Sequence, residues 1–417
     1  MNNFILRYTL EWAILLSTLL SFSSCNNNEK RSYLELSESV LLAESVGIER
    51  EFSISSNCDY TISDIPSWCE IQKRNSNKES SLHIKVFPNN KYIKREAKIK
   101  IESDESIQYL SITQKGLKRE DSLSWYSFSP NSFISMTFTE NNNAERIYTL
   151  RAQTFFINPY IKDKVFLGNI ISRDQELTNS LIDYENYSYN PVTIGALVNG
   201  KSYVKTISKP SKEEMYALTE SIINELPIQN YSFNYDSSPL IYHSHRQLNL
   251  LGRGNLGLEI DKLITGYSYM DKEMSKSIGL IYSYNQILFN VTMDYPRIPT
   301  KEEIKDDVVY IDNINYGKTA FLIIETDYDY NIANNVIKRV MKKQTLNIEE
   351  QEVLADMNAF YLSFSINNRP NIEQGKENVI RRYIDAITTN PIIPISFSIS
   401  NYPNISKGDI TYQLILH

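Results

Sequence analysis

One run, 248–260, constrains the fold of this chain more than any other feature of its sequence, because apolar or small residues alternate there with mostly polar ones. A period of two over thirteen residues gives an extended strand one apolar face, and a membrane-crossing β-strand needs about 9–11 residues. The run therefore predicts a lipid-facing strand that turns at Asp261; a soluble amphipathic strand or a helix–loop is the alternative. The even positions carry five large apolar residues and the odd positions are mostly polar, with Leu251 as the exception; the five are Leu248, Leu250, Leu256, Leu258 and Ile260.

Two short motifs in the same stretch suggest ligands but lack the context that ligands require. Gly252, Gly254 and Gly257 have the spacing of a dinucleotide-binding loop, yet no buried strand precedes them and no helix is expected to follow. His243 and His245 would share one face of a strand with no third ligand in view, so we interpret them as solvated strand residues. We expect no cofactor and no metal.

Composition argues against catalysis and against nucleic acid. The 417 residues carry 43 basic and 50 acidic side chains, a net charge of −7, which does not suit a nucleic-acid partner. Tyrosine (29) and phenylalanine (16) are abundant while glycine is scarce (13), which favours β-rich structure. The four histidines are scattered and no nucleophile–base–orienter set is visible, so we expect that the protein is not an enzyme.

The N-terminus predicts export. Residues 13–20 form an apolar run after Arg7 that is too short to span a bilayer but suits a secretory signal. Small residues and then Cys25 follow, and residues 1–24 resemble a bacterial lipoprotein signal peptide, which implies acylation of Cys25. The alternative is an ordinary cleaved signal. Residues 25–31 would be a tether to a bacterial membrane, in our interpretation the outer membrane; whether it faces the surface or the periplasm stays open, as does release.

Residues 32–116 predict a small β-sandwich. Short alternating segments, such as 52–55 and 97–102, are separated by turn-forming residues, a spacing typical of an immunoglobulin-like fold. Cys58 and Cys69 lie eleven positions apart in a chain that we expect to be exported, where either a disulfide or two free thiols would be permitted.

The order of features in this segment resembles the BACON domain of Bacteroidetes surface lipoproteins. The segment has a Pro-Ser-Trp sequence ending at Trp68 and closes with Thr-Gln-Lys-Gly at 113–116. The resemblance implies a carbohydrate or mucin ligand. We favour a spacer role instead, because no exposed aromatic platform is evident and Trp68 is expected in the core.

Residues 118–417 predict an α+β region. Ser211 to Glu214 forms a capping-box start, with apolar residues at helical spacing behind it. A second amphipathic helix is predicted over 378–387, and a strand follows over 395–400. The fold expected for the whole chain is therefore multidomain: an immunoglobulin-like sandwich, then an α+β region.

Three ordered motifs in this region resemble the cholesterol-dependent (thiol-activated) cytolysins. They are the stretch 241–296, the strand 309–326 with its Tyr-Gly-Lys-Thr sequence, and Asn-Pro-Ile-Ile-Pro-Ile-Ser at 390–396. The resemblance implies a bent antiparallel sheet flanked by two helical clusters, 245–275 and 330–357. On oligomerisation each cluster would unfurl into an amphipathic hairpin of a shared barrel in a target membrane.

The resemblance also implies residues for subunit contact and for a hinge. Tyr316 and Gly317 belong to the strand motif, and Tyr361 falls where the family has an aromatic that stacks across subunits. Asn367 and Asn368 replace the family's Gly-Gly hinge; asparagine tolerates left-handed backbone less freely than glycine.

Two departures from the family shape the functional expectation. All three tryptophans (Trp12, Trp68 and Trp125) precede the motifs, so a Trp-rich cholesterol-reading loop is not expected, and a longer cytolysin-like partner would supply membrane recognition. Both faces of 330–357 carry charges, which are costly against lipid. We therefore expect a pore-forming lipoprotein that oligomerises with itself or with that partner; the alternative is a non-lytic binding or scaffold lipoprotein that kept the fold.

Overall fold

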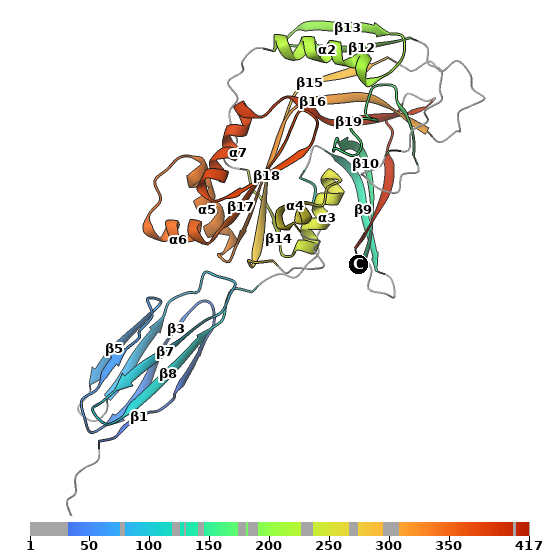
Figure 1. Cartoon of the computed structure of the whole chain (residues 1–417). Helices are drawn as coiled ribbons and strands as arrows, with labels where there is room; N and C mark the ends of the chain where they lie inside the picture. Colours follow the sequence, from blue (N-terminus) through green and yellow to red (C-terminus); the bar gives the residue numbers. More distant parts are fainter. Residues whose placement is uncertain are drawn as a thin grey trace, which may run out of the picture. The chain divides into compact units, whose positions relative to one another are not determined.

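The computed structural model forms two compact units (Figure 1). One unit contains the described residues up to Asn89 together with Lys94–Gly116, and the other contains Asn90–Ile93 and the described residues from Leu117 onward. The expected signal peptide, Cys25 and tether lie outside the described residues. Those residues are 32–75, 80–118, 126–128, 131–140, 146–173, 181, 191–226, 237–266, 274–294, 308–402 and 406–416.

The first unit is a β-sandwich of two four-stranded sheets, as the alternating segments predict. One sheet has the order β1-β3-β6-β5 and the other β2-β8-β7-β4. Alternate residues of both sheets, such as Phe52, Ile84 and Ile112, are almost fully buried between them. The strands are β1 (Leu34–Leu36), β2 (Val40–Ala43), β3 (Ile48–Ser56), β4 (Thr61–Ser63), β5 (Cys69–Asn75), β6 (Ser80–Val86), β7 (Arg95–Glu102) and β8 (Ile107–Gln114).

The two cysteines of this unit are free thiols, so a disulfide between them is not formed. Cys58 lies in the turn after β3, where its Sγ is 3.6 Å from the carbonyl oxygen of Tyr33. Cys69 begins β5 and is buried in the core of the sandwich, where burial raises the pKa of its thiol to about 11. Strand β6 lies between β3 and β5, which keeps the two cysteines apart. Trp68 packs partly buried against the same core, as expected.

The second unit is built on one antiparallel sheet. Its order is β13-β12-β15-β16-β19-β10-β20, and β9, β11, β14, β17 and β18 pair beside this path. The expected α+β architecture is thus confirmed. The strands are β9 (Ser132–Glu140), β10 (Arg146–Phe156), β11 (Ile170–Ser172), β12 (Val192–Val198), β13 (Lys201–Ile207), β14 (Leu240–Tyr242), β15 (Ile278–Met293), β16 (Val308–Thr326), β17 (Asn358–Phe364), β18 (Pro370–Gly375), β19 (Ile393–Tyr402) and β20 (Ile410–Leu416).

Six helices lie in the described part of this unit, and side chains cap the start of several of them. The Ser211 hydroxyl accepts a hydrogen bond from the Glu214 backbone N–H, as predicted, and Asn347 and Glu350 form a complete capping box. None of the described helices is both long and apolar enough to cross a membrane. The helices are α2 (Lys212–Glu225), α3 (His245–Leu256), α4 (Ile260–Thr265), α5 (Tyr330–Met341), α6 (Ile348–Asp356) and α7 (Glu377–Thr389).

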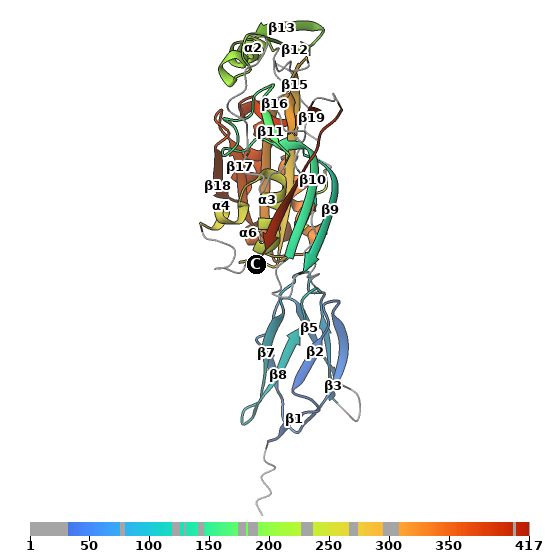
Figure 2. The same cartoon turned by 90° about the vertical axis from the view of Figure 1, so that its right-hand side faces the viewer.

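The long strands β15 and β16 form the spine of the second unit (Figures 1 and 2). At one end β15 pairs with β12 and β16 with β11 and β19; at the other end β15 pairs with β14 and β16 with β17. A bulge between Ile287 and Phe289 separates these two regions. Gly317 lies beside the bulge, where a Cβ would be only 1.8 Å from the Gln286 carbonyl oxygen, so only glycine fits.

We predict that Gly317→Ala lowers the free energy of unfolding by about 2 kcal/mol or more, because the added methyl overlaps backbone that cannot move without breaking the β15–β16 ladder. Gly200→Ala is the matched control. It has a φ of +78° but open space around its Cβ, so it should cost only about 1 kcal/mol of backbone strain. Urea denaturation checks both variants, and equal losses would contradict the steric account.

Candidate functional site

The alternating run 248–260 is helical in this structure, so the strand interpretation is wrong here and the helix–loop alternative is correct. Helix α3 covers most of the run and α4 begins at its end. All five large apolar residues on the even positions are at most 3% exposed. The strand interpretation failed because the apolar residues also fit a helix. Leu251, at an odd position, is fully buried as well, so the apolar residues match a 3.6-residue period as well as a two-residue period.

Two of the three glycines of the run, Gly252 and Gly257, build the helical turn rather than a phosphate loop. Gly257 ends α3 in the left-handed conformation (φ 63°), and its backbone N–H donates to the Arg253 carbonyl. Gly252 lets α4 approach α3 closely, since a Cβ there would lie 2.5 Å from the Leu258 carbonyl oxygen. The glycine spacing is therefore explained by packing between two short helices.

Two helical clusters cover opposite faces of the β14–β18 part of the sheet (Figure 1). The first cluster, α3 and α4, packs on Ile281, Phe321 and Phe360. The second cluster, α5 and α6, packs with α7 on the other face, against Leu280 and Leu322. Both clusters occur where the cytolysin resemblance implies them, at 245–275 and 330–357, although residues 267–273 of the first lie outside the described residues.

All four chain segments that lead into or out of these clusters meet the sheet at one row of paired residues. Tyr242 pairs with Gly279, Gly279 with Glu325, and Glu325 with Asn358. The chain leaves the sheet after Tyr242 and, one residue beyond Glu325, after Thr326; it returns at Ile278, one residue before Gly279, and at Asn358. Each of the two segments between the strands, 243–277 and 327–357, is more than long enough for two membrane-crossing strands of about 9–11 residues and a turn.

Glu325 joins the first cluster to this row. It is 3% exposed and accepts hydrogen bonds from the Tyr242 hydroxyl (3.1 Å) and the Ser275 hydroxyl (3.3 Å). The Nε2 atom of His245, the first residue of α3, lies 2.9 Å from the same carboxylate. Burial and then the charge of Glu325 raise the pKa of Tyr242 well above its usual range, which keeps its hydroxyl protonated as a donor. The interpretation of His245 as a solvated strand residue is therefore wrong.

A second charged group joins the start of β15 to the end of the second cluster. The Lys276 ammonium lies 2.8 Å from Asp356 and 3.0 Å from Asp327, and these side chains are 11–19% exposed. Asp356 also accepts from the Thr326 hydroxyl and from the backbone N–H of Asp327. Burial alone would raise the pKa of Asp356, but the hydrogen bond from Lys276 and these two donors outweigh it and lower the pKa.

Asp261 is a fully buried carboxyl without a cationic partner in the described structure. One of its oxygens accepts from the Asn249 amide at 2.8 Å, which joins α4 to α3. Its Oδ2 atom and the Oδ1 atom of Asn249 have no hydrogen-bond donor among the described residues. Burial is the main cause that raises the pKa of Asp261. This buried acceptor pair weakens the packing of α4 on α3 when Asp261 is ionised.

We predict that Asp261→Asn raises the free energy of unfolding at pH 7 by about 1 kcal/mol, because an amide brings a donor to a site that holds unpaired acceptors. Because burial raises the pKa of Asp261 in the folded protein, its neutral carboxyl favours folding relative to the ionised form. This stability is complete below the unfolded pKa of 3.8 and is lost as pH rises through the folded pKa. Urea denaturation at pH 4 and pH 7 should therefore show the gain mainly at pH 7. A gain of equal size at both pH values would contradict the titration of Asp261.

Asn368, one of the two asparagines expected in place of a Gly-Gly hinge, fixes the position of the turn between β17 and β18. Asn368 adopts a left-handed conformation (φ 54°) and is 2% exposed. Its side-chain amide donates to the backbone carbonyls of Ile157 (2.8 Å) and Pro394 (2.9 Å). These bonds tie the turn to the regions that follow β10 and begin β19. The neighbouring Asn367 is exposed.

The expected subunit-contact residues are buried in this state. Tyr361 is 2% exposed, and its hydroxyl donates to the Asn390 side chain at 2.7 Å. Tyr316 is 9% exposed and stacks on Phe289 at 4.9 Å between ring centroids. Gly317 lies beside the bulge described above. A contact between subunits through Tyr361 therefore requires that the surrounding elements first move.

We predict that Asn368→Gly lowers the free energy of unfolding by about 1–3 kcal/mol, because two buried carbonyls lose their donor while glycine keeps the left-handed backbone. Asn367→Gly, the same substitution one position earlier at an exposed side chain, should change it by less than about 0.5 kcal/mol. Hydrogen exchange should also become faster in β18 of the Asn368 variant alone. Indistinguishable variants would refute the role of the Asn368 amide.

Comparisons with known proteins confirm both sequence resemblances. Residues 59–115 match the BACON family, described as "Putative binding domain, N-terminal". The fold matches a structure of pneumolysin with a TM-score of 0.50 and 15% identity, over 71% of each chain. Cytotoxin protein suilysin from Streptococcus suis (TM-score 0.49, 15% identity, 70% of each chain) and listeriolysin O (0.48, 16%, 70% of this chain and 68% of that chain) are also similar. No curated protein matches the chain by sequence.

Proposed function

We propose that this protein perforates a target membrane by oligomerising and converting its two helical clusters into inserted β-hairpins. The observation that carries the proposal is the row Tyr242–Gly279–Glu325–Asn358. Because all four crossings lie on one row, both clusters can extend as strands that continue existing antiparallel ladders in register. Neither conversion needs the sheet itself to rearrange.

The sequence of the first cluster supports this conversion. In α3 and α4 the apolar residues of 248–260 are buried against the sheet. In an extended strand the apolar residues at even positions would occupy one face, while Asn249, Arg253 and Asn255 would occupy the other, together with Leu251. Paired strands also satisfy every backbone donor and acceptor, which lipid requires. One sequence thus suits both a soluble helical form and an inserted form.

The proposal includes the anchor and the partners that the sequence predicts. Acylated Cys25 would hold the exported chain to a bacterial membrane. The sandwich of residues 32–116 would be a spacer, and glycan binding is its second candidate role. A longer cytolysin-like partner would supply recognition of the target lipid, and copies of this chain or that partner would complete the oligomer. The action would be mechanical rather than enzymatic.

A non-lytic scaffold protein is the second candidate, and the charges of the second cluster favour it. Arg339 and Glu350 pair at 2.5 Å between α5 and α6, an arrangement that suits a permanent helical structure. In a hairpin, the charges of 330–357 would fall on both faces. This candidate predicts that locking the clusters changes no activity of the protein.

We predict that a disulfide between cysteines at positions 249 and 261 blocks dye release from liposomes, and that reduction restores it. The native side chains at these positions, Asn249 and Asp261, are hydrogen-bonded at 2.8 Å. In an extended hairpin the same positions would be about 35–40 Å apart, at about 3.3 Å per residue, so the bridge and the hairpin exclude each other. The chain from Ser32, with Cys58 and Cys69 replaced, would be assayed with varied lipids, after limited proteolysis and with candidate partners.

The matched control is a disulfide between cysteines at positions 290 and 315. The native Asn290 and Asn315 are direct cross-strand partners in β15 and β16, a pair that would stay together in both forms. This lock should leave dye release unchanged. Release that persists with the oxidised 249–261 lock would count against insertion of this hairpin, and an absence of release under every condition would favour the scaffold candidate.

A further inference from the structure

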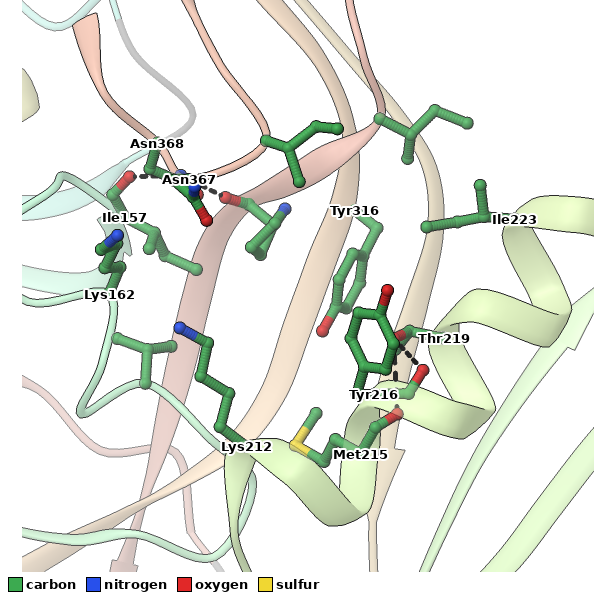
Figure 3. Close-up of a pocket in the computed structure, with 14 residues that line it drawn as sticks. Ile157, Lys162, Lys212, Met215, Tyr216, Thr219, Ile223, Tyr316, Asn367 and Asn368 are labelled. Atoms are coloured by element: carbon green, nitrogen blue, oxygen red, sulfur yellow. Dashed lines mark hydrogen bonds between the residues drawn. The ribbon is translucent and has the colours of Figure 1, made fainter.

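A cavity of about 180 Å³ lies between α2 and the turn that joins β17 to β18 (Figure 3). Its wall is mainly apolar, with Val165 from the segment between β10 and β11, Met215 and Ile223 from α2, and Ile392 and Pro394 near the start of β19. Apolar cavities of about 150 Å³ are large enough to hold benzene. This cavity therefore has room for a hydrocarbon group of about six carbons.

The mouth of the cavity carries apolar side chains that are unusually exposed. Ile366, in the turn, is 73% exposed, and Tyr216 of α2 is 63% exposed. Tyr316 also lines the cavity and is almost buried, and the Thr219 hydroxyl donates to the backbone carbonyls of Met215 and Tyr216. An apolar chain that enters past Ile366 would cover hydrocarbon surface that now faces water, which favours binding.

Two lysines line the same cavity and give it a preferred ligand charge. In the view of Figure 3, Lys162 and Lys212 lie on one side and Tyr316, Tyr216 and Met215 on the other. Lys212 is paired with the exposed Asp163 at 2.7 Å. The net charge of these three groups is positive, so the cavity combines an apolar interior with a cationic rim.

We propose that this cavity binds a single-chain amphiphile with an anionic headgroup, such as a medium-chain fatty acid. Its hydrocarbon tail lies against Met215, Ile223 and Ile392, and its carboxylate lies between Lys162 and Lys212. The occupant also contacts Ile366 and Asn367, on the turn that Asn368 ties to its neighbours. Occupancy therefore holds this turn in place. The binding does not depend on whether the protein forms pores.

The test is calorimetric titration of the purified chain with hexanoate, octanoate, decanoate and dodecanoate below their micelle concentrations. Each added methylene should tighten binding about four-fold while it enters the cavity, and the gain should stop when the cavity is full. Decanol should bind more weakly than decanoate, and decylamine most weakly of all. Equal affinity for the three head groups, or no saturable binding, would overturn the proposal.

Surface variants separate this site from non-specific binding. Lys162→Gln should weaken decanoate binding about three-fold, and Ile366→Ser about four-fold. Asp163→Asn should tighten binding, because it frees Lys212 for the ligand. Lys407→Gln, an exposed lysine that does not line the cavity, is the matched control. If Lys162→Gln and Ile366→Ser bind as the control does, the site is not this cavity.

Hydrogen exchange and a competition experiment complete the test. Decanoate should slow exchange at the Asn368 amide, which donates to the Ser365 carbonyl within the turn. Unchanged exchange at saturating decanoate would contradict contact with the turn. Lysophosphatidylglycerol, a single-chain anionic lipid used below its micelle concentration, would identify a membrane lipid as the source of the anion if it displaces decanoate; no displacement would identify a soluble amphiphile.

Discussion

The second unit depends on one constraint: both helical clusters begin and end at a single row of the sheet. A chain that leaves a sheet twice and returns twice at one row has four strand ends there that other side chains must cover. Here buried polar side chains cover these strand ends. Glu325 contacts the first cluster through His245 and Ser275. Lys276 bonds to Asp327 and to Asp356 at the end of the second cluster. Buried charged groups of this kind contribute little net stability relative to apolar packing, but they are costly to break singly. They therefore specify where each cluster attaches more than they stabilise it.

The contacts of the first cluster are compatible with the proposed conversion of one sequence between two conformations. The first cluster needs only two short helices, and α4 has six residues, too few to be stable without tertiary contacts. Its apolar residues are buried by the sheet, and its internal polar contact leaves unpaired acceptors at Asp261 and Asn249. The helical form is thus held mainly by contacts to the sheet.

Local patterns in the sequence predicted the architecture well and the site only in part. The period-two segments of 32–116 and the Ser211–Glu214 cap predicted the sandwich and the start of α2. The run 248–260 could not be assigned from its own period, because burial on all sides suits both a helix and a strand. The cytolysin resemblance, rather than the period, placed helices there.

The polar contacts at the row were missed for a physical reason: their partners lie far apart in the chain. His245 and Glu325 are separated by 80 positions, and Lys276 and Asp356 also by 80. One signal was available, since Glu325 follows the apolar run Phe321–Ile324 and a carboxylate there must be buried with partners. Asn368 was noted as a departure from glycine, but its two backbone bonds follow only from the folded turn.

The most direct test of this account is the distance between spin labels at positions 249 and 261, measured by pulsed electron paramagnetic resonance before and after the protein permeabilises liposomes. The labels should be adjacent in the soluble form, because the native side chains are hydrogen-bonded. In the permeabilised sample the account predicts a separation of about 35–40 Å, as in an extended strand. A distance that stays short while the membrane becomes permeable would contradict the conversion of this cluster into a hairpin.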